Sequence, residues 1–308
     1  MVSSSIKIES MIDIRQSINY ANYVKTQGWI VERIKKTNYF IKKIPILGSI
    51  LKIQRPNKID FETIQKIERK YRVFQTILEP NLPFTDSAFD HTSLLHSGYR
   101  LSKSPFLPSK TLHLDLTQSK EQIFKGFSKH TKQAIKKSVV AFGSDEIKGE
   151  GIKIKECSTP KEIENFRNAW KKSVNFKRYV PSLQSLLNLK KSFPNNHSIF
   201  LASHNKIGSI IGGALFTRSS HDFGYYWYGF TNEEGRATLS QYSLLYSGIL
   251  WARNNNCKIF DFEGIYDNRF PNKSWLGFTH FKKSFGGTEI SYPGCYTKFR
   301  LPFTFTKH

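Results

Sequence analysis

The alternation of apolar and polar residues predicts a regular order of elements in the second half of the chain. Residues 152–157 alternate as a half-buried strand does, and residues 160–174 repeat their apolar side chains at helical spacing. Beyond them the pattern predicts a short helix over 182–192, strands over 198–203, 207–216 and 222–230, a long helix over 239–255, and a strand over 258–264. This order, with a mainly antiparallel sheet, predicts an α+β fold.

A capping box marks the start of the helix after residue 159. Thr159 and Glu162 are the capping pair, and Pro160 lies in the first helical turn. The helix that begins there is expected to bury one apolar stripe, formed by Ile163, Phe166, Trp170 and Val174.

The first half of the chain is less regular. Its pattern predicts a helix over 12–29, a lysine-rich strand-like stretch through 44–53, a helix over 60–70, a strand over 71–80, and a loop with a short helix over 82–99. A strand over 111–116 places Leu112, Leu114 and Leu116 on one face. A second capping box, Ser119 with Gln122, opens a helix to about Val140 with an apolar stripe of Ile123, Phe127 and Ile135.

A polar, glycine-punctuated segment over 141–151 predicts a linker between two domains. The expected N-terminal domain is 1–150 and the expected C-terminal domain is 151–294. The tail 295–308 is a candidate to pack on the first domain.

The charge of the chain favours a polyanionic partner. Its 308 residues include 47 Lys and Arg against 24 Asp and Glu, a net charge of +23. Nucleic acid, a phosphate-bearing substrate or an anionic membrane face would suit this surplus, and a lysine-rich composition bias is the alternative. The helix predicted after Ser119 gathers seven candidate cations, which favours anion binding over a merely solvated face: Lys120, Lys125, Lys129, His130, Lys132, Lys136 and Lys137.

Cysteine usage and hydropathy predict a cytoplasmic, soluble protein. Cys157, Cys257 and Cys295 form no CxxC pair, which suggests a reducing compartment. Residues 1–10 lack the apolar stretch of a signal peptide, and runs such as 207–216 are shorter than the ~18 residues of a membrane span. Peripheral contact of the basic surface with an anionic membrane stays open.

The sequence contains no HExxH, GxSxG, Walker A or GxGxxG motif, and its nine histidines show no metal-ligand spacing with the cysteines. We therefore expect no metal site and no nucleophilic triad. The chemistry has to come from other side chains.

The order of elements fits an acyltransferase of the GNAT type, but its cofactor loop is altered. CoA-dependent GNAT enzymes carry [RQ]-x-x-G-x-[GA] before the long helix. Here Gly235 and Ala237 keep the glycine and alanine positions, whereas Asn232 replaces the leading residue and Glu233 and Glu234 place negative charge where a diphosphate would lie. We expect a GNAT scaffold that no longer binds CoA, and no cofactor.

Four segments in order, 16–29, 111–138, 249–265 and 281–287, resemble the Fem-type peptidoglycan bridge-forming aminoacyltransferases over nearly the whole chain. Lys132 stands where arginine is more usual in that family, and Glu263 where glycine is common. The resemblance implies two tandem GNAT-like domains without the helical-hairpin arm that some members carry.

The resemblance also implies an activity. Such enzymes transfer an amino acid from aminoacyl-tRNA to an amino group of the peptidoglycan stem peptide, on UDP-MurNAc-pentapeptide or lipid II, and so build an interpeptide bridge. The donor ester is already activated, so neither a metal nor a covalent enzyme intermediate is needed. Both substrates are polyanions, in agreement with the charge, and no stable protein partner is expected.

The site residues follow from the same resemblance. Lys282 and Phe281, in FTHFKKSFGG, are expected near the reacting carbonyl and the tRNA 3′ end, on a strand that the pair Gly286 and Gly287 ends with a turn. Glu79 is expected to orient or deprotonate the acceptor amine. The further expectation is substrate binding by Tyr226, Tyr228, Lys25 and Arg178, and tRNA binding by Lys125, Lys129, Lys132, Lys136 and Lys283.

Each of these roles has a structural alternative. The lysine can be a surface residue on a strand, the aromatic residues can be core, and the glutamate can cap a strand end. Tyr226 and Tyr228, at i and i+2 of a strand, are expected to share one face. Asp261 is expected to hold the end of its strand.

Two other functions stay open. A CoA-dependent N-acyltransferase could use the same fold, although residues 232–237 argue against it. A non-catalytic RNA-binding protein could use the basic helix, although the chain has no RRM, KH or zinc-knuckle signature.

Overall fold

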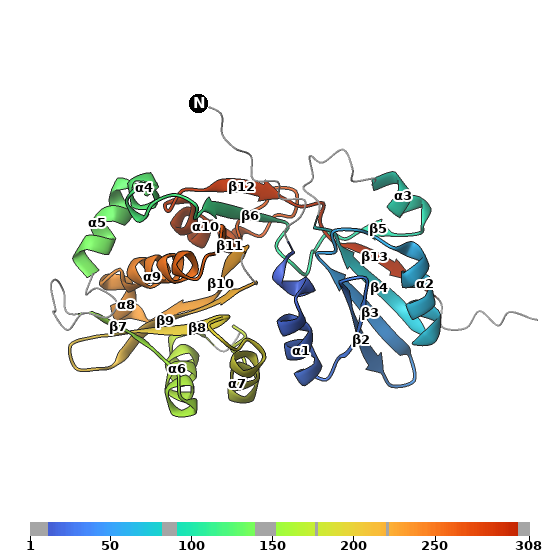
Figure 1. Cartoon of the computed structure of the whole chain (residues 1–308), viewed down its shortest axis with the longest axis horizontal. Helices are drawn as coiled ribbons and strands as arrows, with labels where there is room; N and C mark the ends of the chain where they lie inside the picture. Colours follow the sequence, from blue (N-terminus) through green and yellow to red (C-terminus); the bar gives the residue numbers. More distant parts are fainter. Residues whose placement is uncertain (1–11, 82–90, 139–151, 176–177, 220–221, 301–308) are drawn as a thin grey trace, which may run out of the picture. The chain divides into compact units, whose positions relative to one another are not determined.

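The computed structural model describes residues 12–81, 91–138, 152–175, 178–219 and 222–300, which form two compact units (Figure 1). The first unit comprises 1–111, 266–273 and 290–308, and the second comprises 112–265 and 274–289. Within the described ranges, none of the helices combines the length and the apolar character needed to cross a bilayer.

The first unit is built on a six-stranded sheet in the order β1-β2-β3-β4-β13-β5. Pairing is antiparallel except between β3 and β4, which are parallel. The strands are β1 (Ile30–Ile34), β2 (Thr37–Ile44), β3 (Gly48–Gln54), β4 (Val73–Glu79), β5 (Arg100–Leu101) and β13 (Tyr296–Phe299). The helices are η2 (Ile14–Gln16), α1 (Ile18–Thr26), α2 (Phe61–Lys70) and α3 (His91–His96).

Helix α2 shows how local signals and burial agree in this unit. The carboxylate of Asp60 accepts a hydrogen bond from the backbone N–H of Thr63 at 3.0 Å and so caps the helix. Ile64 and Ile67 then lie on one side and pack into a core that includes Leu51 and Leu78 of the sheet.

The second unit is built on a seven-stranded sheet in the order β12-β6-β11-β10-β9-β8-β7. The strands are β6 (Lys110–Asp115), β7 (Lys153–Glu156), β8 (Ser198–His204), β9 (Ile210–Arg218), β10 (Phe223–Thr231), β11 (Ile259–Gly264) and β12 (Thr288–Ser291). The helices are α4 (Lys120–Gly126), α5 (Lys129–Ser138), α6 (Pro160–Ser173), α7 (Leu183–Ser192), α8 (Glu233–Ala237), α9 (Ser240–Asn254), η3 (Lys273–Trp275) and α10 (Leu276–Lys283).

The element order predicted over 152–264 is confirmed, and the short helix α8 is added to it. Strands β7 to β10 pair antiparallel, β10 pairs parallel with β11, and both predicted capping boxes form. Helices α6 and α9 cover opposite faces of the sheet (Figure 1). Both pack closely, since a Cβ on Gly213 would lie 2.4 Å from the ring of Phe166 of α6, and one on Gly248 of α9 would lie 2.1 Å from the ring of Phe216.

The division between the units differs from the predicted boundary at 150. Strand β6 lies between β12 and β11 in the sheet of the second unit, and Ile123, Phe127 and Ile135 pack into the core of that unit. Residues 112–138 therefore belong to the second unit. The predicted linker over 141–151 lies outside the described residues, and β13 of the predicted tail belongs to the first sheet.

The single helix predicted from Ser119 to about Val140 is wrong, because two helices replace it. Phe127 is extended, with a ψ of 153°, and ends α4. The hydroxyl of Ser128 then accepts a hydrogen bond from the backbone N–H of Thr131 at 3.1 Å and caps the start of α5. Similarly, the helix predicted over 12–29 is split by Ser17 into η2 and α1.

Candidate active site

The segment FTHFKKSFGG is helical, and the strand predicted for it is wrong. Helix α10 covers Leu276–Lys283, because Phe278, Phe281, Lys282 and Phe285 follow helical spacing and face the interior together. After the helix the backbone reverses at Gly286 and Gly287, with φ of +78° and +97°. Any Cβ on Gly287 would lie 2.8 Å from the carbonyl oxygen of His113, so only glycine fits this turn.

Lys282 is buried, with 8% of its surface exposed. Its Nζ donates a hydrogen bond to the carbonyl oxygen of Gly264 at 2.7 Å and lies 5.1 Å from the ring centroid of Phe278 and 5.6 Å from that of Tyr226. Burial lowers the pKa of Lys282 from 10.5 to about 8, against the opposing effect of the nearby negative charges of Glu263 and Asp261. The amine is thus held at one point and can exchange a proton near neutral pH.

A cavity of about 360 Å³ opens at this amine. It brings together five of the predicted site residues from helix α10, strand β10 and the segment after α6: Lys282, Phe281, Tyr226, Tyr228 and Arg178. Its remaining walls are mostly aromatic and include Trp170, Tyr179, Trp227 and Phe278. The cavity combines a buried cation with apolar walls, an arrangement that strengthens electrostatic interactions with a ligand.

A second cavity of about 400 Å³ shares Arg178, Tyr226 and Phe281 with the first, so the two are joined around these side chains. It extends toward the start of α9, where Arg236 and Gln241 line it. The carboxamide Oε1 of Gln241 is buried and has no hydrogen-bond partner among the described residues. A ligand donor could satisfy this oxygen.

Tyr226 and Tyr228 line the same cavity, but their predicted common strand face is wrong. A β-bulge between them pairs Tyr226 with Phe216 and Tyr228 with Leu215, so the two tyrosines project from opposite faces. Tyr226 is stacked on the ring of Phe216, and its hydroxyl lies over Gly229. Burial raises the pKa of Tyr226 to about 12, so its hydroxyl stays protonated and can donate.

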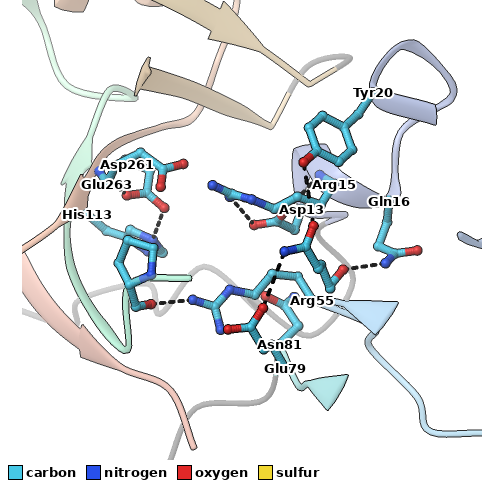
Figure 2. Close-up of polar contacts among 12 residues, drawn as sticks. Asp13, Arg15, Gln16, Tyr20, Arg55, Glu79, Asn81, His113, Asp261 and Glu263 are labelled. Atoms are coloured by element: carbon cyan, nitrogen blue, oxygen red, sulfur yellow. Dashed lines mark hydrogen bonds and ion pairs between the residues drawn. The ribbon is translucent and has the colours of Figure 1, made fainter. Parts of the chain in front are cut away.

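Two predicted site residues, Glu79 and Lys25, lie in the first unit. Glu79 ends β4 and is buried, accepting hydrogen bonds from the backbone N–H of Leu107 at 2.6 Å and from the side chain of Gln54 at 3.3 Å. Figure 2 shows it within a polar network of the first unit. Lys25 is exposed near the end of α1. Their expected roles toward the acceptor stay predictions.

The predicted tRNA-binding lysines surround the junction of α4 and α5 and the end of α10. Lys125, Lys129 and Lys136 are exposed, and Lys132 donates a hydrogen bond to the carbonyl of Lys125 at 3.2 Å. The junction is tied to α10 by the backbone hydrogen bond from Ser128 to Ser284 at 2.9 Å. Lys283 is exposed and pairs with Glu289.

The turn that would hold the CoA diphosphate uses its own backbone N–H groups. The Asn232 side chain accepts from the N–H of Gly235 at 2.8 Å, and the N–H groups of Arg236, Thr238 and Leu239 donate to carbonyls of the same turn. Phosphate binding at such a turn depends on N–H groups that point at the ligand. The turn lies where the diphosphate-binding loop of GNAT enzymes lies. Its four N–H groups named above are already used and are not available to a phosphate.

Several residues of the site were missed from the sequence. Trp170 was assigned to the helix core, and it lines the cavity as well. Glu263 was noted only as a departure from glycine, yet it lines the cavity beside Lys282 with a φ of +60°. Glycine is common at this position in the family that the sequence resembles. Because glycine readily adopts a left-handed backbone, it was the signal that could have revealed this conformation. No pattern in the sequence identified Gln241.

The fold is α+β with two sheet-based units in tandem, as predicted, and the second unit has the strand and helix order of a GNAT-like protein.

The structure is similar to the crystal structure of FemX, with a TM-score of 0.78 at 14% sequence identity over 96% of this chain and 94% of that chain. It is also similar to the C-terminal domain of a putative lysylphosphatidylglycerol synthetase from Agrobacterium fabrum (TM-score 0.56, 13% identity, 92% and 88% of the two chains). L-PGS from Bacillus licheniformis gives a TM-score of 0.56 at 10% identity, with the same coverage. No protein-family model and no curated protein matches the sequence. At these identities the likeness establishes the fold alone.

Proposed function

We propose that the protein is an aminoacyltransferase that moves an amino acid from aminoacyl-tRNA to an amino group of the peptidoglycan stem peptide, on UDP-MurNAc-pentapeptide or lipid II. The observation that carries this proposal is the buried Lys282 at the end of an aromatic cavity, in a chain with the fold of FemX. An acyltransferase in the wider sense is the coarser conclusion that the similar structures support.

The proposed reaction joins the acceptor amine to the carbonyl carbon of the aminoacyl ester. A C–N bond forms, the C–O bond to the terminal ribose breaks, and the proton lost by the amine is transferred to the leaving ribose oxygen. The ammonium of Lys282 would stabilise the negative charge that develops on the carbonyl oxygen, since it is fixed before the reaction by the carbonyl of Gly264. Because its pKa lies near 8, the charged form predominates at pH 7.

The aromatic side chains would hold the donor end. Phe281 faces both cavities, and its ring packs on Tyr242 at 5.0 Å between centroids, so it is rigidly placed. A terminal adenosine could stack in the shared cavity, because every base has a π-face that an aromatic ring can contact. The exposed guanidinium of Arg178, which also lines both cavities, would suit a phosphate of either substrate.

CoA-dependent acyl transfer is the weaker alternative. The four N–H groups of the turn after β10 donate internally, and Glu233 and Glu234 lie in the first turn of α8. Both features disfavour a diphosphate there.

A transfer assay tests the proposal. The protein is incubated with total charged tRNA and, in separate reactions, with UDP-MurNAc-pentapeptide, lipid II or phosphatidylglycerol, and the acceptors are weighed by mass spectrometry. We expect a mass increase of one aminoacyl residue on a peptidoglycan precursor. Transfer only to phosphatidylglycerol, or no transfer from any charged tRNA, would contradict the proposal.

Two controls sharpen the assay. Lys282→Met should abolish transfer, whereas Lys161→Met, which changes an exposed lysine on α6, should retain it. Acetyl-CoA replaces the charged tRNA in a parallel reaction, and acetylation of the acceptor there would favour the alternative function instead.

A further inference from the structure

The carboxylate of Asp261 connects two parts of the second unit through separate oxygens. Its Oδ1 accepts a hydrogen bond from the backbone N–H of Glu263 at 2.7 Å, and its Oδ2 lies 3.2 Å from Nε2 of His113 on the adjacent strand β6 (Figure 2). Both side chains are buried. Nδ1 of His113 has no hydrogen-bond partner among the described residues, so the pair favours the tautomer with the proton on Nε2.

The hydrogen bond to Glu263 supports an unusual backbone conformation. Glu263 has a φ of +60°, in the left-handed region that glycine adopts readily and other residues avoid. An Asp side chain that accepts from the N–H two residues later is a recognised way of stabilising a turn. Here the turn falls at the end of β11, where the strand would otherwise continue extended.

The consequence reaches Lys282 through the next residue. The carbonyl oxygen of Gly264, directly after the turn, accepts the hydrogen bond from Nζ of Lys282 at 2.7 Å. With Glu263 extended, this carbonyl would point elsewhere, because a change of φ and ψ at one residue redirects the peptide that follows it. The position of the amine therefore depends on a turn that Asp261 holds.

We propose that Asp261 is a positioning residue: it holds Glu263 in the left-handed conformation so that the carbonyl of Gly264 fixes the amine of Lys282 at the cavity. The catalytic meaning of this inference rests on the proposed function. The hydrogen bonds that place the amine are independent of it. The alternative is that Asp261 merely closes the end of the strand, with no effect on the lysine.

The test measures the titration of Lys282 directly. Protein labelled with ¹³C-lysine is titrated by NMR, and the Lys282 signal is assigned by its loss in Lys282→Arg. The charges that act on this amine are those of Glu263 and Asp261, and Arg178 lines the same cavity. In the native protein we expect a midpoint at about pH 8.

Variants of Asp261 and Glu263 distinguish the positioning of Lys282 from mere closure of the strand end. Asp261→Ala removes the turn, and we expect the midpoint of Lys282 to rise by at least roughly one unit toward the value of a solvated lysine. Asp261→Ala with Glu263→Gly should bring the midpoint back to that of Glu263→Gly alone, or below it, since glycine adopts the left-handed conformation unaided and both proteins lack the Glu263 charge. Asp261→Asn keeps an oxygen that can accept from the Glu263 N–H, so the midpoint should stay or fall after loss of the negative charge.

An unchanged midpoint in Asp261→Ala would overturn the proposal, and so would a double variant that folds without recovering. If Asp261→Ala does not fold, Asp261→Asn decides, and a rise of its midpoint would overturn the proposal. The titration needs neither tRNA nor acceptor. A protein that shows no transfer can still show the expected titration of Lys282, and a protein that transfers can fail to show it. The two proposals can therefore be refuted separately.

Discussion

Replacement of Lys282 by methionine gives the sharpest test of the site's electrostatics. The side chains have similar lengths, but methionine carries neither the charge nor the hydrogen bond to the carbonyl of Gly264. Burial lowers the pKa of Lys282 from 10.5 to about 8. One pKa unit is worth about 1.4 kcal/mol, so the buried ammonium destabilises the folded protein by roughly 3 kcal/mol below pH 8.

The sign of the pH dependence follows from proton binding. Between pH 8 and 10.5 the folded lysine has lost its proton while the unfolded chain retains it. The free energy of unfolding of the native protein therefore rises with pH in this window, and methionine removes that contribution. At pH 7 the gain from removing the buried charge is offset by the unpaired Gly264 carbonyl, which costs about 1–3 kcal/mol. We expect the two proteins to have similar stability at pH 7, and the variant to be less stable by roughly 3 kcal/mol at pH 10.5.

Urea unfolding at pH 7, 8.5, 9.5 and 10.5, followed by circular dichroism, measures this difference. Other groups titrate in both proteins and cancel in the comparison. Lys283→Met is the matched control, because Lys283 lies at the surface and its removal involves no comparable burial. Stability curves of Lys282→Met and native protein that run parallel from pH 7 to 10.5 would refute the reasoning.

Two further changes test the walls and the surface of the second unit. Gly229→Ala would place a Cβ 1.9 Å from the hydroxyl of Tyr226, so it should lower stability by about 1–3 kcal/mol and reduce transfer, whereas Gly126→Ala, with open space around it, should do neither. Lys129→Gln should weaken tRNA binding and reduce its salt slope by about one, measured by filter binding at several salt concentrations. The matched change Lys161→Gln, on α6, should leave both unchanged; equal effects at the two lysines would contradict a specific basic surface.

Periodicity was sufficient for most of the second unit. The strands β7 to β11 and the helices α6, α7 and α9 follow patterns that depend on neighbours along the chain, and both capping boxes form as expected. One cavity is lined by five of the residues for which the resemblance implied catalytic or substrate-binding roles: Lys282, Phe281, Tyr226, Tyr228 and Arg178.

Where the prediction went wrong, a residue distant in the sequence decided the outcome. Phe127, where α4 ends, and Phe285, just after α10, meet edge to face in the core of the second unit, at 5.1 Å between ring centroids. The bulge between Tyr226 and Tyr228 depends on the register with β9, which no local pattern specifies.

The sequence by itself determined the element order over 152–264, the two capping boxes and the surplus of positive charge, because these depend on side-chain type and spacing. Only the tertiary structure decided that Lys282 is buried and its pKa lowered, that a turn at Glu263 directs the Gly264 carbonyl to it, and that β6 joins the second sheet. Desolvation and strand pairing depend on which segments meet in space, and spacing along the chain does not encode that.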